Sequence, residues 1–248
     1  MEKKPETAVK GSQSRFPTTR HSAIATLRQG EASEKHQAWE SLIRMYWKPV
    51  YKYLRIKWRK SNADAEDLTQ GFFASAIEKN FFYSYDPVRS RFRTFLRTCL
   101  DGYAANEEKA ARTLKRGGGA IFVPFDFHQA EIELKQSQYS PDEVFEKEWI
   151  RALFSTALDE FRRSCEERGK MVPFQIFEKY DIEKDPATRI SYAELSETFG
   201  IPVTTVTNYL AFARREFRKM VLLKLEEISG NQEEYRSDAR RLFGATSK

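Results

Sequence analysis

The fold is decided by one stretch in the C-terminal half, which runs from Ile190 to Lys224 and reads ISYAELSETFGIPVTTVTNYLAFARREFRKMVLLK. Its first part, from about Tyr192 to Phe199, predicts a short helix with Ser191 as the N-cap and Glu194 as the capping-box partner. Gly200 can adopt the left-handed conformation that commonly ends a helix. The stretch therefore predicts the first helix and the turn of a helix-turn-helix.

The second helix is predicted to begin near Val203, because Pro202 prevents the first helix from continuing. Its apolar residues have the spacing of one buried stripe; they are Val206, Leu210, Ala213, Phe217 and Val221. The outward residues at its start are where a recognition helix contacts bases, and basic residues follow where phosphates would lie. The candidate DNA contacts are Thr204, Thr205, Thr207, Asn208, Arg214, Arg215 and Arg218. An ordinary helical hairpin with a solvated basic face explains the same pattern.

Composition points to an all-α protein. The 248 residues include only 11 Gly and 9 Pro, and apolar positions recur mostly at three and four residues. The net charge of +6 favours an anionic partner. Cys99 and Cys165 give no disulfide framework and are expected to be small buried residues. Since no run of 18 apolar residues occurs, we expect no membrane contact and a cytoplasmic location.

Breaks in the helical pattern predict two helical domains joined by an acidic linker. The predicted parts are a flexible N-terminal tail (1–21), a first helical domain (22–117), the linker (118–146), a helix-turn-helix domain (147–230) and a polar C-terminal tail (231–248). Within the first domain, Pro49 predicts the start of a new helix, and Asp64 is the expected cap of the next one.

A long basic helix is predicted from about Arg91 to Arg116. The segment from Arg89 to Arg116 holds eight basic and three acidic residues. A basic stripe beside aromatic and amide groups can hold a phosphate backbone and bases, although most charge runs are only exposed faces. The candidate contacts here are Arg93, Arg97, Asn106, Lys109, Arg112, Lys115 and Arg116.

Several motifs resemble those of bacterial RNA polymerase sigma factors of the extracytoplasmic-function type. The run Ala65-Glu66-Asp67-Leu68-Thr69-Gln70, followed by Phe72-Phe73, is similar to the family's region 2.2 signature. Phe92-Arg93-Thr94-Phe95-Leu96 resembles the motif that opens region 2.3, and the stretch from Ile201 to Arg215 resembles the recognition helix of region 4. The resemblance covers about Ser22 to Arg116 and Trp149 to Ile228.

The resemblance implies a factor that binds core RNA polymerase and directs promoter recognition, DNA melting and transcription initiation. The implied partners are the polymerase β′ clamp helices and β flap, promoter DNA, and an anti-sigma factor or other regulator. The residues carried over to the polymerase contact are Asp67, Leu68, Gln70, Phe72 and Phe73. Two adjacent phenylalanines beside polar residues also predict an exposed apolar patch, although one of them could belong to the core. Gly102 stands where the family often has an asparagine, and Tyr209 and Phe212 stand where basic residues are common. The base preference of the chain therefore stays open.

The acidic stretch from Ala120 to Glu148 has seven acidic and two basic residues, a net charge of −5. It is expected either to be a solvated linker kept extended by self-repulsion or, as the resemblance suggests, to imitate RNA in a positively charged channel.

No catalytic or metal-binding motif is found in the sequence. His21, His36 and His128 are far apart and near no cysteine pair, and no nucleophile stands beside a base. We therefore expect no enzyme activity and no cofactor. Two alternatives to the sigma-factor hypothesis remain: a stand-alone helix-turn-helix transcriptional regulator, and an RNA-binding adaptor that uses the basic helix.

Overall fold

The computed structural model describes residues 22–111, 125–134, 139–183 and 190–244, and within these ranges the chain is all-α, as predicted. The helices are α1 (Ala23–Gln29), α2 (Ala32–Lys57), α3 (Asn62–Glu78), α4 (Phe92–Ala111), α5 (Phe127–Leu134), α6 (Pro141–Glu167), α7 (Met171–Phe177), α8 (Tyr192–Phe199), α9 (Val203–Ile228) and α10 (Gln232–Phe243), with short turns η1 (Phe81–Ser84) and η2 (Glu178–Ile182).

Two local predictions in the N-terminal half are wrong. Pro49 lies inside the 26-residue helix α2 and starts no new helix. A proline removes one hydrogen bond from a helix interior, and here the flanking Tyr46 and Val50 are buried, so packing keeps the helix continuous. The N-cap of α3 is Ser61, whose hydroxyl oxygen accepts a hydrogen bond from the backbone N–H of Asp64.

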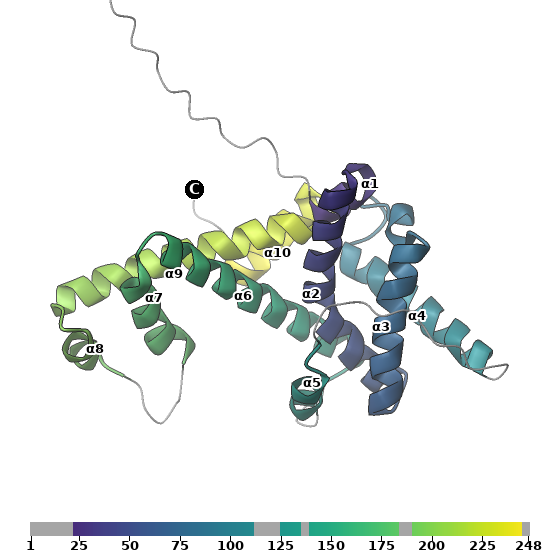
Figure 1. Cartoon of the computed structure of the whole chain (residues 1–248), viewed down its shortest axis with the longest axis horizontal. Helices are drawn as coiled ribbons and strands as arrows, with labels where there is room; N and C mark the ends of the chain where they lie inside the picture. Colours follow the sequence, from purple (N-terminus) through teal and green to yellow (C-terminus); the bar gives the residue numbers. More distant parts are fainter. Residues whose placement is uncertain (1–21, 112–124, 135–138, 184–189, 245–248) are drawn as a thin grey trace, which may run out of the picture.

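Two hydrophobic cores are joined by two long helices. The larger core gathers α1 to α4 with the first half of α6 and the last part of α9, and the smaller core lies among α6, α7, α8 and the start of α9. Figure 1 shows α6 and α9 side by side, running from the N-terminal helices to the end that carries α7 and α8. The predicted domain boundary at 146/147 falls inside α6, so no linker separates the two cores there.

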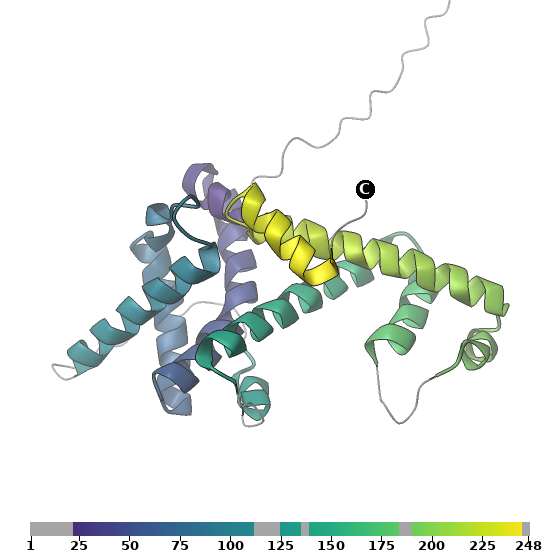
Figure 2. The ribbon, with the colours of Figure 1, turned by 180° about the vertical axis from the view of Figure 1, so that it is seen from behind.

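The predicted polar tail, 231–248, contains a docked helix. Asn231 caps α10 by accepting a hydrogen bond from the backbone N–H of Glu234. Seen from behind in Figure 2, α10 lies in yellow beside α9. Gly230, which joins the two helices, leaves room for Tyr85: a Cβ on this glycine would stand 2.1 Å from the tyrosine hydroxyl. The close approach of these two residues fixes where α10 begins.

The acidic stretch is not a solvated linker in the part that the structure describes. Each of its seven carboxylates has a partner, and most of these partners are basic residues of α2 and α4. Asp126 and Glu143 cap helices; Glu131 pairs with Arg55, Glu133 with Lys48 and Lys52, Asp142 with Arg97, Glu146 with Arg93 and Arg241, and Glu148 with Lys52 and Arg151. The negative charge of the stretch therefore balances basic groups of the chain itself.

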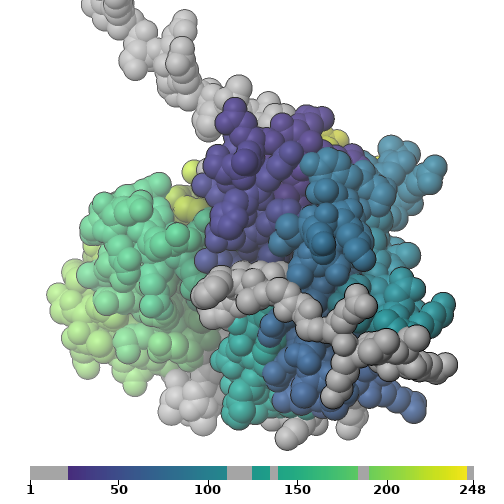
Figure 3. Space-filling view, turned by 45° about the vertical axis from the view of Figure 1, so that its right-hand side comes forward, coloured from purple at the N-terminus to yellow at the C-terminus, as the bar shows by residue number. Residues whose placement is uncertain are grey.

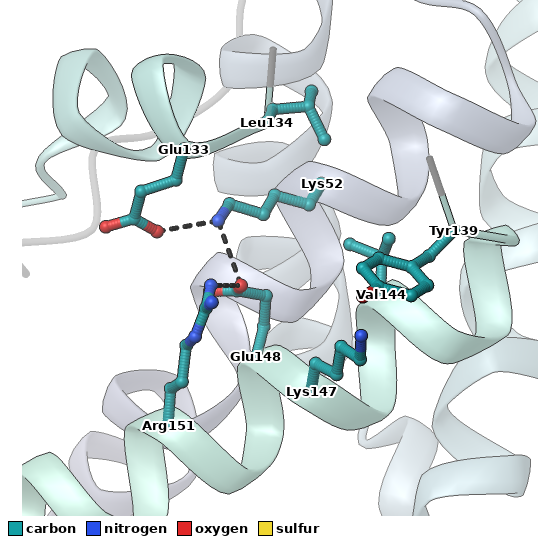
Figure 4. A pocket seen from close by; sticks show the side chains of 8 residues that line it. All are labelled: Lys52, Glu133, Leu134, Tyr139, Val144, Lys147, Glu148 and Arg151. Carbon is teal, nitrogen blue, oxygen red and sulfur yellow. Dashed lines mark hydrogen bonds and ion pairs between the residues drawn. The ribbon is translucent and has the colours of Figure 1, made fainter. Parts of the chain in front are cut away.

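Lys52 is the centre of one such group (Figure 4). Its ammonium lies 2.7 Å from Glu133 and 3.0 Å from Glu148, and its side chain is 1% exposed. These residues border a cavity of about 400 Å³ that Tyr139, Lys147 and Arg151 also line. Partial burial would raise the pKa of Glu133, but hydrogen bonds from Lys52 and Lys48 outweigh it and lower the pKa to about 2.

The substitution Glu133→Gln should cost on the order of 2 kcal/mol of stability at neutral pH, since a carboxylate whose pKa is depressed on folding stabilises the folded state. That contribution is present above the unfolded-state pKa of 4.5 and is lost as the pH falls toward about 2. Urea unfolding of the parent chain and of the Glu133→Gln variant, across this pH range, measures the difference in stability. Glu78→Gln, at an exposed position of α3, is the matched control. A stability difference that stays constant on acidification would contradict the prediction.

Figure 3 shows one face of the molecule, with the purple and blue atoms of the N-terminal helices in front and the fainter green atoms of the second half of the chain behind them at the left. Cys165 is buried, as predicted, and Cys99 is half-buried, where burial raises the pKa of its thiol to about 11.

Among the described helices, none is long and apolar enough to cross a membrane.

Candidate nucleic-acid interface

The helix-turn-helix forms as predicted. The hydroxyl oxygen of Ser191 accepts a hydrogen bond from the backbone N–H of Glu194, whose carboxylate accepts one from the N–H of Ser191. Gly200 ends α8 in the left-handed conformation, with φ of 63°. The Ser196 hydroxyl then donates to the carbonyl of Ile201 at 2.5 Å and holds the turn closed. Local signals alone are sufficient to shape this unit.

The start of α9 presents polar side chains to solvent. Val206, Leu210 and Ala213 are buried against α8 and α7, as the predicted stripe requires. Thr204, Thr207 and Asn208 are exposed, and Thr205 is half-buried. Phe217, predicted to be buried, is half-buried between the two cores. The exposed residues have the placement that base recognition in a major groove needs.

The three predicted arginines of α9 have different environments. Arg215 is exposed and lies seven residues after Asn208 and eleven residues after Thr204, so the three side chains share one line along the helix. Arg214 instead donates to Asp181 at 2.7 and 3.1 Å. Arg218 is half-buried, with its guanidinium 4.9 Å from the ring centre of Phe243.

These contacts give Arg214 a structural role and leave Arg215 free to contact DNA. The hydrogen bonds to Asp181 raise the pKa of Arg214, which joins η2 to α9 and so positions the recognition helix. Arg215 has its side chain 71% exposed, and its nearest acidic group is Glu216 at 3.9 Å, a long and weak pair. Of the three, Arg215 is best placed to contact a phosphate.

A groove lies beside this line. Tyr209 and Phe212 face Val172 and Pro173 across a cavity of about 370 Å³, and Lys170 lies 4.8 Å from the ring centre of Phe212. The two aromatic side chains therefore pack sideways toward the start of α7, so they widen the helix-turn-helix unit and leave the base-facing line to the smaller residues.

The basic surface predicted on α4 is largely closed. Arg93 is 3% exposed and lies against α6 and α10, and the Arg97 side chain, 17% exposed, pairs with Asp142 at 3.4 Å. As described here, neither is open to a phosphate, which corrects their prediction as DNA contacts. Asn106 and Lys109 are exposed, while the predicted contacts Arg112, Lys115 and Arg116 lie outside the described residues.

The surface of α3 agrees only in part with the predicted polymerase contact. Asp67 is exposed, and Leu68 and Gln70 are half-buried. Phe72 and Phe73 are 0% and 1% exposed, so the predicted apolar patch is wrong. Phe72 packs edge-on against Phe73 and Tyr103, because Gly71 lets the Tyr103 hydroxyl approach the α3 backbone.

Tyr235, Leu242 and Phe243 indicate in the sequence that a short docked helix could form in the polar tail, and the structure contains it as α10; the polar contacts of this helix were not predicted. A further signal for this helix is the capping residue Asn231, and Tyr235, Ala239 and Leu242 pack on the larger core. Its two buried acids, Glu234 and Asp238, have no pattern of their own in the sequence. Their burial was therefore not predicted from the sequence.

Comparisons of the chain with protein-family models, with curated proteins and with solved structures gave no match. Within the described ranges, no three His, Cys, Asp or Glu side chains are grouped so that they could hold a metal ion. A function is therefore inferred from the geometry above together with the resemblance in sequence.

Proposed function

We propose that this chain is a transcription initiation factor of the sigma type, which binds core RNA polymerase and directs it to promoter DNA through α9. One observation carries the DNA part of the proposal: Thr204, Asn208 and Arg215 form one exposed line on the second helix of a closed helix-turn-helix. Short polar side chains at the start of the line suit base edges, and the arginine two turns further suits a phosphate.

The polymerase part is supported by the resemblance of the α3 sequence and by the exposure of Asp67 there, next to the half-buried Gln70. Docking on this surface would be mainly polar, since the phenylalanines that follow belong to the core. Their burial also favours a second candidate, a helix-turn-helix regulator that binds duplex DNA without polymerase, because it removes the apolar part of the expected docking patch.

Mixing the chain with core RNA polymerase and testing co-elution on a sizing column separates these candidates. The double variant Asp67→Ala with Gln70→Ala should abolish the complex and stay folded, because surface substitutions change stability by only about 0.5 kcal/mol. Glu78→Ala, at an exposed position on the same helix, is the control and should leave the complex intact. A complex that survives the double variant would refute this docking surface. Tight duplex binding without any polymerase complex would favour the regulator.

The double variant Asn208→Ala with Arg215→Ala should weaken promoter binding about hundredfold, since a base contact contributes about 1–3 kcal/mol and a phosphate contact adds to it. Binding of labelled promoter DNA by the polymerase complex measures the change. Arg163→Ala removes an equally exposed arginine from α6 and should leave affinity unaltered. Equal losses in both variants would show that only overall charge matters.

A further inference from the structure

Arg93, at the start of α4, is held on every side that the structure describes. Its guanidinium donates to both carboxylate oxygens of Asp238 at 2.8 and 3.0 Å and to Glu146 at 3.0 Å, and it lies 3.8 Å from the ring centre of Trp149. Asp238 is 0% exposed. Burial by itself would lower the pKa of Arg93, but its hydrogen bonds with Asp238 outweigh that effect and raise it. This arginine is therefore charged and fully occupied by carboxylates.

The neighbouring arginines are held in the same way. Arg91 donates to the Ser237 hydroxyl at 2.8 Å and pairs with Asp238 at 3.3 Å, and Arg97 pairs with Asp142 of α6. A guanidinium binds carboxylate and phosphate with the same forked geometry, so the two anions compete for it. Carboxylates of α6 and α10 thus occupy positions that phosphates would take on the first turns of α4.

The attachment of α10 is mainly polar. The buried residues of this helix are Glu234 and Asp238, and its apolar side chains are only partly covered. Glu234 accepts a hydrogen bond from the backbone N–H of Phe92, the first residue of α4, at 3.4 Å, and Asn231 donates to the carbonyl of Pro87 at 2.8 Å. An attachment made by charged and polar groups can be exchanged for a polyanion more easily than one made by apolar burial.

We propose that α10 is an autoinhibitory helix whose carboxylates take the place of nucleic-acid phosphates on α4. The chain then binds nucleic acid at α4 only after α10 is displaced. The proposal rests on the proposed function in that it assumes α4 is a nucleic-acid surface, but the contact between α10 and α4 can be tested without that assumption.

The test compares the full chain with the double variant Glu234→Gln and Asp238→Asn, which removes both buried charges. The matched control, Glu226→Gln with Glu233→Gln, removes two exposed charges from α9 and α10 and gives the same net charge. Two readouts are taken: amide hydrogen exchange across the chain, and binding of a labelled single-stranded DNA of mixed sequence. Arg93→Ala is then added to the double variant.

In the double variant, exchange should rise about tenfold in α10 and the first turn of α4 but stay unchanged in α8 and α9, and DNA should bind about tenfold more tightly with a steeper salt dependence. The control should match the parent chain in both readouts. Adding Arg93→Ala should remove the gain in affinity, because Arg93 would be the group that α10 had covered.

Three results would overturn the proposal: unchanged exchange at α10, increased exchange without increased DNA binding, or increased binding that does not depend on Arg93. If exchange rises everywhere, the fold itself has been lost, and the milder variant Asn231→Ala decides, because it removes the cap of α10 and its hydrogen bond to the Pro87 carbonyl but no cation. It should raise exchange and DNA affinity about threefold, and no change in either would overturn the proposal. The polymerase test with Asp67 and Gln70 judges the proposed function separately, since α3 makes none of the α10 contacts described.

Discussion

Replacing Arg93 by alanine lowers the free energy of unfolding by about 3–5 kcal/mol, the cost of leaving a buried charge without its partner. Asp238, which is 0% exposed, would lose its two shortest ion-pair contacts, and Glu234 would lose the attraction of the guanidinium. Burial already raises the pKa of Glu234, and without the attraction of Arg93 this carboxyl takes up a proton still more readily in the folded state. The loss of stability should therefore shrink as the pH is lowered toward the pKa of Glu234.

Chemical unfolding of the two chains at neutral and mildly acidic pH measures this effect. Arg89→Ala is the control, because Arg89 is 86% exposed and its ion pair among the described residues is the long one with Asp86 at 3.4 Å, and it should change stability by about 0.5 kcal/mol or less. Adding Asp238→Asn to Arg93→Ala should restore part of the loss, because it removes the unpaired charge. If the effects of Arg93→Ala and Asp238→Asn on the free energy of unfolding add without coupling, the buried network does not exist in solution.

Replacing Phe72 or Phe73 by alanine should each cost about 3–5 kcal/mol, as expected for a large side chain removed from a packed core. Both rings are buried, and Phe72 also contacts Phe81 and Tyr103. Had these rings formed an exposed docking patch, the same substitutions would change stability little and would act only on binding. Thermal and urea unfolding of the single variants distinguish these cases.

Asp67→Ala is the control for this pair, since the side chain is exposed one to two turns earlier on the same helix. It should leave the unfolding midpoint nearly unchanged. A Phe73→Ala chain that unfolds like the parent and fails only in a polymerase assay would mean that the α3 surface is open in solution, against the packing described.

The sequence predicted those parts of the fold that depend on local signals. Ser191, Glu194 and Gly200 set the boundaries of α8 through contacts within a few residues, and the buried face of α9 follows a simple period. These features need no knowledge of the rest of the chain. The exposed candidates Thr204, Asn208 and Arg215 were predictable for the same reason.

What the sequence could not predict depends on distant partners. Arg93 and Asp238 are 145 residues apart in the sequence, and arginine and aspartate are residue types that are usually exposed, so nothing local indicates their burial. The acidic residues of the predicted linker have no partner nearby in the sequence, and their ion pairs with basic residues of α2 and α4 form only in the folded chain. Phe73 could have faced solvent or core, and the tertiary packing around α3 buries it to 1% exposure. Pairings of this kind are set by tertiary contacts, which a local period does not encode.

The continuity of α6 has one more consequence. At 27 residues it is about 40 Å long, and α9 runs beside it over much of that length. Two DNA elements contacted from its opposite ends would have to lie at one fixed separation, on the order of 12 base pairs of straight duplex. Each added base pair would turn the second element by about 35° around the duplex axis, away from α9. Under the proposed function, the chain should therefore tolerate little variation in spacer length, and promoters with one inserted base pair would lose most of their activity.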